Sequence, residues 1–464
     1  MQSLKRFCVL CALLFSINGV YAQQSTPTVT LKALLNKVEA NAPTLITDSA
    51  LIGIRQAQAS ETRSNWLPNL RLNYQTDIGT NNNTAGPYFG FGIIPSNSRG
   101  VRTASNSSAV LTNLGIAALE WEVYNFGAYA AQNKVAVSEI DVEQKNFAQS
   151  KYNLQAYTIG YYLQLLRLQD YLSIQTLNIT RSQEIKRSIM SLAKSGIRPG
   201  VDTSLAEAEL SKSKLNYIEL DNQLKQVQLK LSAISGYPYQ SIKPDTTVEL
   251  TLIKQATAPE QLTIDTVNHP MINYYRSIVQ NSLQKEDLVK KQYNPKIMFE
   301  AAAWGRGSSV DANDNYNSLS SGWGFERNNY LVGIGISYNL FDLRRKHLKT
   351  TTQKAATNYA QKKLTEQKNL IAVSVNQADI DLQTARERLF EIPKQLKAAN
   401  AGYRQKLSLY KSGLTDIIEL NAALGILYRA ETDYVQAKYA YTSALFQKAV
   451  TGNQVNTVLN LLNP

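Results

Sequence analysis

Four segments of the chain alternate between apolar and polar residues with the period of a β-strand. In residues 69–77, Leu70, Leu72 and Tyr74 alternate with polar residues. Residues 296–303 repeat this pattern, with an apolar residue at every second position. A period of two gives a strand two different faces. We therefore predict one strand in each segment, and a returning strand for each in residues 109–124 and 330–340.

Residues 330–340 show the most regular alternation. One face of this predicted strand carries Tyr330, Val332, Ile334, Ile336, Tyr338 and Leu340. Tyrosines at both ends of an apolar row are typical of a lipid-facing strand with an aromatic girdle at each membrane surface. The length of this segment also matches the roughly 9–11 residues that a tilted strand needs to cross a bilayer.

Residues 109–124 alternate less regularly. Alignment with the second pair of strands divides them into an outward and an inward set. The outward set is Ala117, Leu119 and Trp121, and the inward set is Glu120 and Glu122. At the end farther from the following helix both faces are apolar, which predicts a β-bulge there. A soluble sandwich with one buried face is an alternative interpretation of the strands. Four strands cannot close a barrel, because about eight are needed, so strands in lipid would require an oligomer.

Two stretches, residues 128–195 and 344–412, predict exceptionally long helices. The first contains no proline and only one glycine, Gly160. At about 1.5 Å per residue, each helix would extend for about 100 Å. Such lengths are typical of coiled coils and tubes. Pro393 interrupts the second stretch and predicts a kink, because proline removes one helical hydrogen bond.

Each long helix is predicted to end at a glycine, Gly196 or Gly413, in a left-handed cap. A second helix follows in each half of the chain, at about residues 202–235 and 416–450. Their narrow apolar seams and largely polar surfaces are typical of helices that pack side by side around water.

The chain contains an internal repeat. The sequence Asn-Ala-Pro at residues 41–43 recurs as Asn-His-Pro at residues 268–270, an offset of 227. Lys-Ser-Gly at residues 194–196 recurs at residues 411–413, an offset of 217. Further matches in the same order indicate a duplication with one ten-residue insertion. The predicted domains are residues 23–257, with a β-hairpin at about 69–124, and residues 258–464, with a β-hairpin at about 296–342.

Residues 1–22 have the pattern of a secretory signal peptide. Lys5 and Arg6 precede an apolar run that ends in small residues. Cys8 and Cys11 both lie in this segment, so the remaining chain has no cysteine for a disulfide or a thiolate metal site. No later segment approaches 18 consecutive apolar residues, so we expect no transmembrane helix. These observations leave a periplasmic protein, a secreted protein or an outer-membrane β-barrel.

Charge and candidate chemistry exclude several functions. The net charge is +13 but no Lys/Arg block occurs, so we expect no nucleic-acid partner. The 44% apolar content excludes an intrinsically disordered chain. The two histidines, His269 and His347, have no partner at the spacing of metal ligands. No P-loop or nucleophile elbow occurs, so we expect no cofactor, no metal and no enzymatic activity.

Taken together, these features resemble the TolC family of outer-membrane efflux proteins. The resemblance covers nearly all of residues 31–453. The motifs that carry it, with their second copies, are residues 41–43, 67–68, 121–127, 196–202, 338–342 and 410–413.

The resemblance implies an α+β membrane protein that forms a homotrimer. Each chain would give four transmembrane strands to one twelve-stranded β-barrel, which a periplasmic α-helical barrel continues. The protein would lie in the outer membrane with a large periplasmic portion, in contact with outer-membrane lipid. Its partners would be a periplasmic adaptor and an inner-membrane RND or ABC-type pump. The expected function is a passive exit duct of a tripartite efflux or type I secretion system. The alternative is a structural periplasmic coiled-coil or adhesin-like protein without transport activity.

The resemblance places the periplasmic aperture beside the two glycine turns. Gly196 and Gly413 would mark the helical hairpin tips, where the adaptor binds, and both also shape the backbone. Glu419 and Asp202 each lie six positions after one of these glycines. Tyr410 lies three before Gly413, and we expect it to hydrogen-bond to Asp202.

This aperture departs from the family pattern in two positions. Thr415 stands where some members carry a basic residue, and Ala422 where some carry a second acidic residue. Two interpretations of Glu419 remain. Three copies of its carboxylate could form a cation-attracting constriction. Alternatively, Glu419 is a solvated carboxylate favoured by the dipole of a helix N-terminus.

Overall fold

The computed structural model describes residues 28–82, 103–196, 199–254, 256 and 264–462. The predicted signal peptide lies outside the described residues. The chain forms two compact units. The helical unit comprises the described parts of residues 1–51, 144–276 and 363–464, and the sheet unit those of residues 52–143 and 277–362. Two long helices, α4 (Ala128–Lys194) and α8 (Asp342–Lys411), contribute residues to both units.

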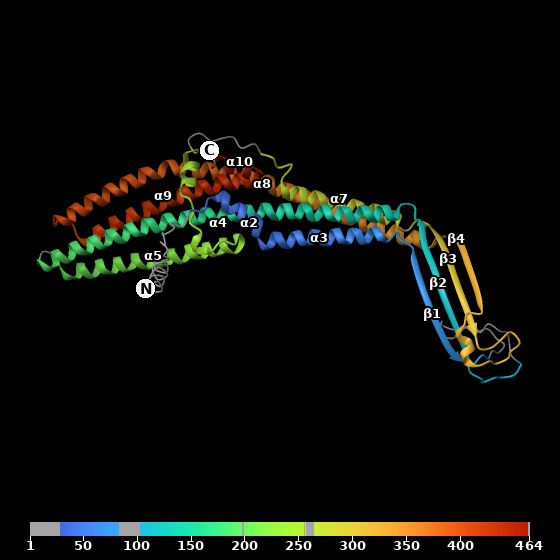
Figure 1. Ribbon diagram of the computed structural model, residues 1–464. Helices are drawn as coiled ribbons and strands as arrows, with labels where there is room; N and C mark the ends of the chain where they lie inside the picture. Colours follow the sequence, from blue (N-terminus) through green and yellow to red (C-terminus); the bar gives the residue numbers. More distant parts are fainter. Residues whose placement is uncertain (1–27, 83–102, 197–198, 255, 257–263, 463–464) are drawn as a thin grey trace, which may run out of the picture. The chain divides into compact units, whose positions relative to one another are not determined.

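The sheet unit is built on one antiparallel sheet in the order β1-β2-β3-β4 (Figure 1). Its elements are β1 (Asn69–Gly79), β2 (Val110–Tyr124), β3 (Lys296–Ser308), the short helix η3 (Leu319–Trp323) and β4 (Arg327–Ser337). Parts of α3 (Pro43–Ser64) and α7 (Pro270–Lys291) also belong to this unit. All four predicted strands are therefore present. β1 and β4 form the two edges, and each is 11 residues long.

Two predictions about the strands are wrong in detail. β4 ends at Ser337 rather than Leu340, so Tyr338 lies beyond the strand. Ser337 pairs with Lys296, the first residue of β3. Pro295 directly precedes Lys296 and has no N–H group to continue the hydrogen-bond ladder. The register of β2 against β3 does shift, but between Glu122 and Tyr124, next to the helix rather than at the far end.

The helical unit packs antiparallel helices side by side. Beyond α4 and α8 it contains α2 (Leu31–Asn41), α5 (Gly200–Ser235), η1 (Tyr239–Ser241), α6 (Thr247–Lys254), α9 (Ile417–Thr451) and α10 (Val455–Leu461). The order strand, strand, long helix, helix thus occurs twice along the chain, as the repeat predicts. Helix α8 continues through Pro393 without a break. Among the described residues, no helix combines the length and the apolar character needed to cross a lipid bilayer.

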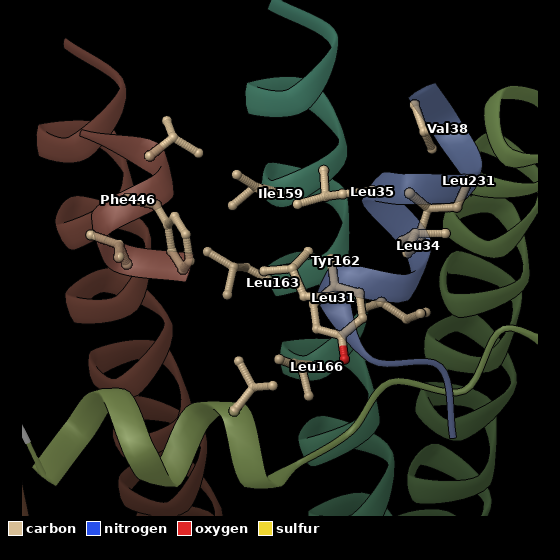
Figure 2. Close-up of a cluster of buried hydrophobic side chains, with 14 of the residues drawn as sticks. Leu31, Leu34, Leu35, Val38, Ile159, Tyr162, Leu163, Leu166, Leu231 and Phe446 are labelled. Carbon is tan, nitrogen blue, oxygen red and sulfur yellow. The ribbon is translucent and has the colours of Figure 1, made fainter. Parts of the chain in front are cut away.

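The largest buried cluster of the helical unit lies where α2 inserts between α4 and α5 (Figure 2). Leu34 of α2, Tyr162 of α4 and Leu231 of α5 are each fully inaccessible to solvent. The hydroxyl of Tyr162 donates to the carbonyl of Val29 at 2.9 Å, so this buried polar group is satisfied. Each fully buried leucine contributes about 1.5–3 kcal/mol relative to an exposed one. The cluster therefore fixes the middle of α4 against the segments that precede and follow it.

Candidate functional site

One face of the sheet is continuously apolar. Cross-strand pairing aligns Ala117, Ala303 and Tyr330 in one row, and Leu119, Ala301 and Val332 in the next. The predicted outward residues of β2 thus share a face with those of β4. The outermost side chains of this face are the most exposed, with 85% of Tyr330, 74% of Ile334 and 76% of Ile336 accessible. We call this surface the apolar face; its edge strands contribute Leu70, Leu72, Tyr74, Tyr330, Val332, Ile334 and Ile336.

Aromatic side chains gather at both ends of the apolar face. Near the helices, the rings of Trp66 and Trp121 meet edge to face at 5.1 Å. At the opposite end, Tyr74 meets Phe325 at 6.3 Å in the same geometry. Aromatic residues concentrate at membrane–water interfaces because their rings are apolar with a polar edge. The apolar face therefore has the composition of a lipid-facing band with two aromatic girdles.

The charged side chains of the four strands all lie on the opposite face of the sheet, which also carries apolar residues such as Ile116 and Trp304. Glu120 and Glu122, the predicted inward residues, lie on this face, here called the polar face, together with Glu300, which pairs directly with Glu120. Arg71 forms an ion pair with Glu120, and Lys296 forms one with Glu122 at 2.7 Å. Two faces of such different chemistry suit a sheet with lipid on one side and water on the other.

The two glycine turns of the helical unit both have the predicted left-handed backbone. Gly196 has a φ of +71° and Gly413 a φ of +78°. After α8, the N–H of Gly413 donates to the carbonyl of Tyr410, and the N–H of Leu414 donates to that of Leu409. This pair of hydrogen bonds is a Schellman motif, which requires the left-handed residue that glycine supplies most easily. The turns lie at the same end of the unit, here called the tip (Figure 1).

The structure joins the two repeats at the tip through Tyr410 and Asp202. The Tyr410 hydroxyl of α8 donates to Oδ2 of Asp202 in α5 at 3.4 Å. Both side chains are buried, with 1% and 7% exposure. A surrounding cluster of α4, α5, α8 and α9 residues, including Ile189, Ala206 and Leu420, excludes water from this contact. The expected hydrogen bond is thus present in an environment that strengthens it.

Glu419 has a different environment. It is the third residue of α9, and its N–H donates to the side chain of the N-cap residue, Asp416, at 2.8 Å. Its carboxylate is exposed and accepts from Nζ of Lys406 in α8 at 2.8 Å. Thr415 is half-buried in the turn before this cap. The dipole of α9 and the ammonium of Lys406 both compensate the Glu419 charge.

Two further electrostatic links of the helical unit were not predicted. Arg181 of α4 binds Glu431 of α9 with two hydrogen bonds of 2.8 Å, which is the strong bidentate geometry. The Glu431 carboxylate raises the pKa of Arg181. Arg181 and Glu431 are separated by 250 residues, so no local spacing in the sequence signals this link.

The second link is a buried cluster around Lys438 of α9. Its ammonium contacts Asp170 of α4 and, at 2.6 Å, Glu249 of α6. Burial raises the pKa of Glu249, while the Lys438 ammonium acts in the opposite direction. This cluster fastens the short helix α6 to the two longer ones.

The histidines show no geometry for metal binding. Nδ1 of His269 accepts from the N–H of Met271 at 3.2 Å, and Nε2 lies 3.3 Å from the Val450 carbonyl. Burial lowers the pKa of His269, so the ring is neutral at pH 7. Within the described part of the chain, no group of three or more His, Cys, Asp or Glu residues is placed to hold a metal ion.

Comparison with known proteins identifies the same architecture elsewhere. VceC from Vibrio cholerae is 13% identical over 91% of this chain and 96% of its own, with a TM-score of 0.69. The CmeC outer membrane channel of Campylobacter jejuni is 13% identical over 93% and 89%, with a TM-score of 0.71. The open-state MtrE outer membrane channel of Neisseria gonorrhoeae is 16% identical over 91% and 89%, with a TM-score of 0.64. A search of curated protein sequences gave no match.

The sequence profile of one protein family covers most of the chain. The sequence profile of the outer membrane efflux protein family matches residues 34–237 and 267–447. These two segments contain both pairs of strands, the helices α4, α5 and α8, and most of α9. The resemblance inferred from the sequence motifs is thereby confirmed. The chain therefore belongs to the outer membrane efflux protein family.

Proposed function

We propose that the chain forms a homotrimeric exit duct in the outer membrane, as part of a tripartite efflux or type I secretion system. The observation that carries this proposal is the apolar face between two aromatic groups. A monomer would leave this face in water, and it would also leave the hydrogen-bonding groups of β1 and β4 unpaired at two long edges.

Closure with further copies of the chain satisfies both requirements at once. β4 of one copy would pair with β1 of the next, and three copies would give twelve strands without an edge. Backbone groups in lipid must be paired within the protein, so an open sheet could not remain in the membrane. The polar face, with its paired charges, would then enclose water.

The tip would form the periplasmic aperture, with Asp202, Tyr410, Thr415 and Glu419 near it. Exposed apolar side chains at the tip support a contact with a periplasmic adaptor. Leu414 is 74% exposed, Ile418 68% and Val201 62%. Apolar groups at the end of a polar helical bundle are typical of a protein interface. The adaptor would connect the duct to an inner-membrane RND or ABC-type pump, which supplies the energy, so the duct itself needs no catalytic site.

Purification from membranes tests this proposal against the alternative of a soluble structural protein. We expect the chain to require detergent for extraction. Light scattering of the purified particle should give three times the mass of one chain, and the trimer should be heat-modifiable on gels. We also expect ion-conducting channels after insertion into a planar bilayer. A monomer in the soluble periplasmic fraction would contradict the proposal and would favour the coiled-coil alternative.

The adaptor contact has a separate test at the tip. Replacing Leu414 and Ile418 together with Ser should abolish cross-linking to a co-purifying periplasmic protein while trimers and conductance persist. The same change at Leu340 and Phe341, which are equally exposed but lie beyond β4, is the matched control. Equal loss of cross-linking in both variants would refute the assignment of the tip.

A further inference from the structure

Two arginines face each other on the polar face of the sheet. Arg306 of β3 is directly opposite Arg327 of β4 in the antiparallel ladder. Side chains in such pairs lie about 4.5–5.5 Å apart at Cβ, and like charges there destabilise the sheet. Both side chains are exposed, and neither has a carboxylate partner within the described part of the chain.

This lack of partners distinguishes the pair from other cations of the polar face. Arg71 and Lys296 are each neutralised by a glutamate on the neighbouring strand. Folding alone would favour a neutral or acidic residue opposite Arg306. Two like charges at directly opposed strand positions, with no carboxylate to neutralise them, are typical of a functional position.

The backbone that carries the two arginines is held firmly from the other side. The ring of Phe325 covers Gly115 and Gly305, where a Cβ would lie 2.7 Å and 2.9 Å from its atoms. A Cβ on Gly307 would lie 1.7 Å from the Gly324 carbonyl, so only glycine allows the loop this close. The N–H of Glu326 also donates to the Arg306 carbonyl at 2.8 Å. The loop therefore occupies the apolar side of this strand end and leaves the polar side to the guanidinium groups.

We propose that Arg306 and Arg327 form a basic collar that attracts anions at the outer mouth of the duct. This inference rests on the proposed function, because the polar face encloses water only in a closed barrel. Two arginines from each of three chains would place six guanidinium groups around one opening. A cleft with one sign of charge and low-dielectric walls concentrates the opposite ion.

Acidic groups of the described strands lie at a distance from the arginine pair. Asp77 is the acidic residue of β1 on the same face at this end, and it accepts two hydrogen bonds from Gln75. β2 separates β1 from β3, which puts the Asp77 strand about 10 Å from that of Arg306. The acidic pair Glu120 and Glu300 lies six residues farther along β3, about 20 Å away. Asp311, Asp314 and Glu326 belong to the segment that joins β3 to β4, and among the described residues none of them forms an ion pair with Arg306 or Arg327.

Ion selectivity of the purified full-length trimer in a planar bilayer tests the collar. The permeability ratio of chloride to potassium is measured in a KCl gradient at low ionic strength, where the Debye length is about 30 Å. The double variant R306Q/R327Q should lower this ratio by about threefold or more. The charge-conserving variant R306K/R327K should keep the wild-type ratio. The difference should shrink at 1 M KCl, where the Debye length is about 3 Å.

A multivalent anion gives a second measurement. Inorganic tripolyphosphate added to one chamber should reduce the current of the wild type and of R306K/R327K, but not that of R306Q/R327Q. The single variants R306Q and R327Q should give intermediate ratios, and they remain available if the double variant does not assemble. Unchanged selectivity in conducting glutamine variants would overturn the collar and leave the duct intact. A wild-type trimer that never conducts would overturn the duct itself.

Discussion

Replacing Tyr410 with Phe removes one hydroxyl from the buried tip and leaves the shape of the side chain unchanged. In the wild type this hydroxyl donates to Asp202 at 3.4 Å. Hydrogen bonds to charged groups contribute about 1.5–3 kcal/mol, but this one is near the long limit of the normal range, so about 1 kcal/mol is a suitable value. That energy corresponds to about a fivefold change in an equilibrium constant. If three tips open together, the loss is about 3 kcal/mol and the change exceeds a hundredfold.

The assay is the open probability of single trimers in a planar bilayer. We expect Y410F to raise it, because the hydrogen bond is formed only while α5 and α8 remain packed together. D202N should have a similar effect, and the double variant should be no worse than either single variant. Tyr403 provides the control, since it is buried in the same cluster but forms no hydrogen bond to a carboxylate in the described structure. We therefore expect Y403F to behave like the wild type.

Two results would refute this reasoning. Equal open probabilities for Y410F and Y403F would show that the hydroxyl of Tyr410 does not hold the tip. Additive effects of Y410F and D202N would show that the two side chains act independently, because a shared hydrogen bond can be lost only once.

Three other changes have defined outcomes. Burial lowers the pKa of His269, so the stability that its neutral ring contributes is present above the unfolded pKa of about 6.5 and is lost as the pH falls through the folded pKa. Differential scanning calorimetry should therefore show a smaller melting-temperature difference between pH 7.5 and pH 5 in H269Q than in the wild type. K438M should destabilise the trimer by about 3–5 kcal/mol, because it leaves two carboxylates in a buried site without their cation, and denaturant titration measures this loss. G413V should lower the yield of trimers by straining a backbone with φ of +78°, whereas G402A, inside α8 with no atom near its Cβ position, should stabilise the fold by about 0.5–1 kcal/mol. A normal yield of G413V trimers with normal efflux would contradict the expectation for Gly413.

Features with a short sequence period were predictable, and contacts between distant segments were not. The alternation of residues 69–77 and 296–303 identifies β1 and β3 because side-chain direction reverses at every residue of a strand. Gly196 and Gly413 end their helices because few other residues adopt the left-handed conformation cheaply. The pattern alone could not end β4 at Ser337, since that end depends on a partner strand that starts after a proline.

The contacts of the loops and the partners in the ion pairs could be identified only in the folded chain. Phe325 covers glycines of two different strands, and the nearest of them lies twenty residues away in the sequence. Arg181 and Lys438 find their carboxylates on other helices. A charged residue on a polar helix surface has many possible partners in the sequence, so only the packing of α4, α6 and α9 selects among them.

The duplicated sequence gives a left-handed glycine followed by a helix twice at the tip, but the two copies have different chemical environments. Asp202 and Glu419 are each the third residue of the helix that follows a glycine turn, so the repeat places both carboxylates at the same dipole position. They differ because Tyr410 has no counterpart: the residue 217 positions earlier is Ala193. Asp202 therefore lies in a water-excluded contact, whereas Glu419 is exposed and pairs with Lys406. The two carboxylates therefore differ in how strongly salt affects their interactions. The buried link can hold the tip closed at any ionic strength, while the exposed pair is screened by salt. We propose that the buried contact between the repeats controls the opening of the tip, whereas the Glu419 carboxylate is compensated by the α9 dipole and by Lys406.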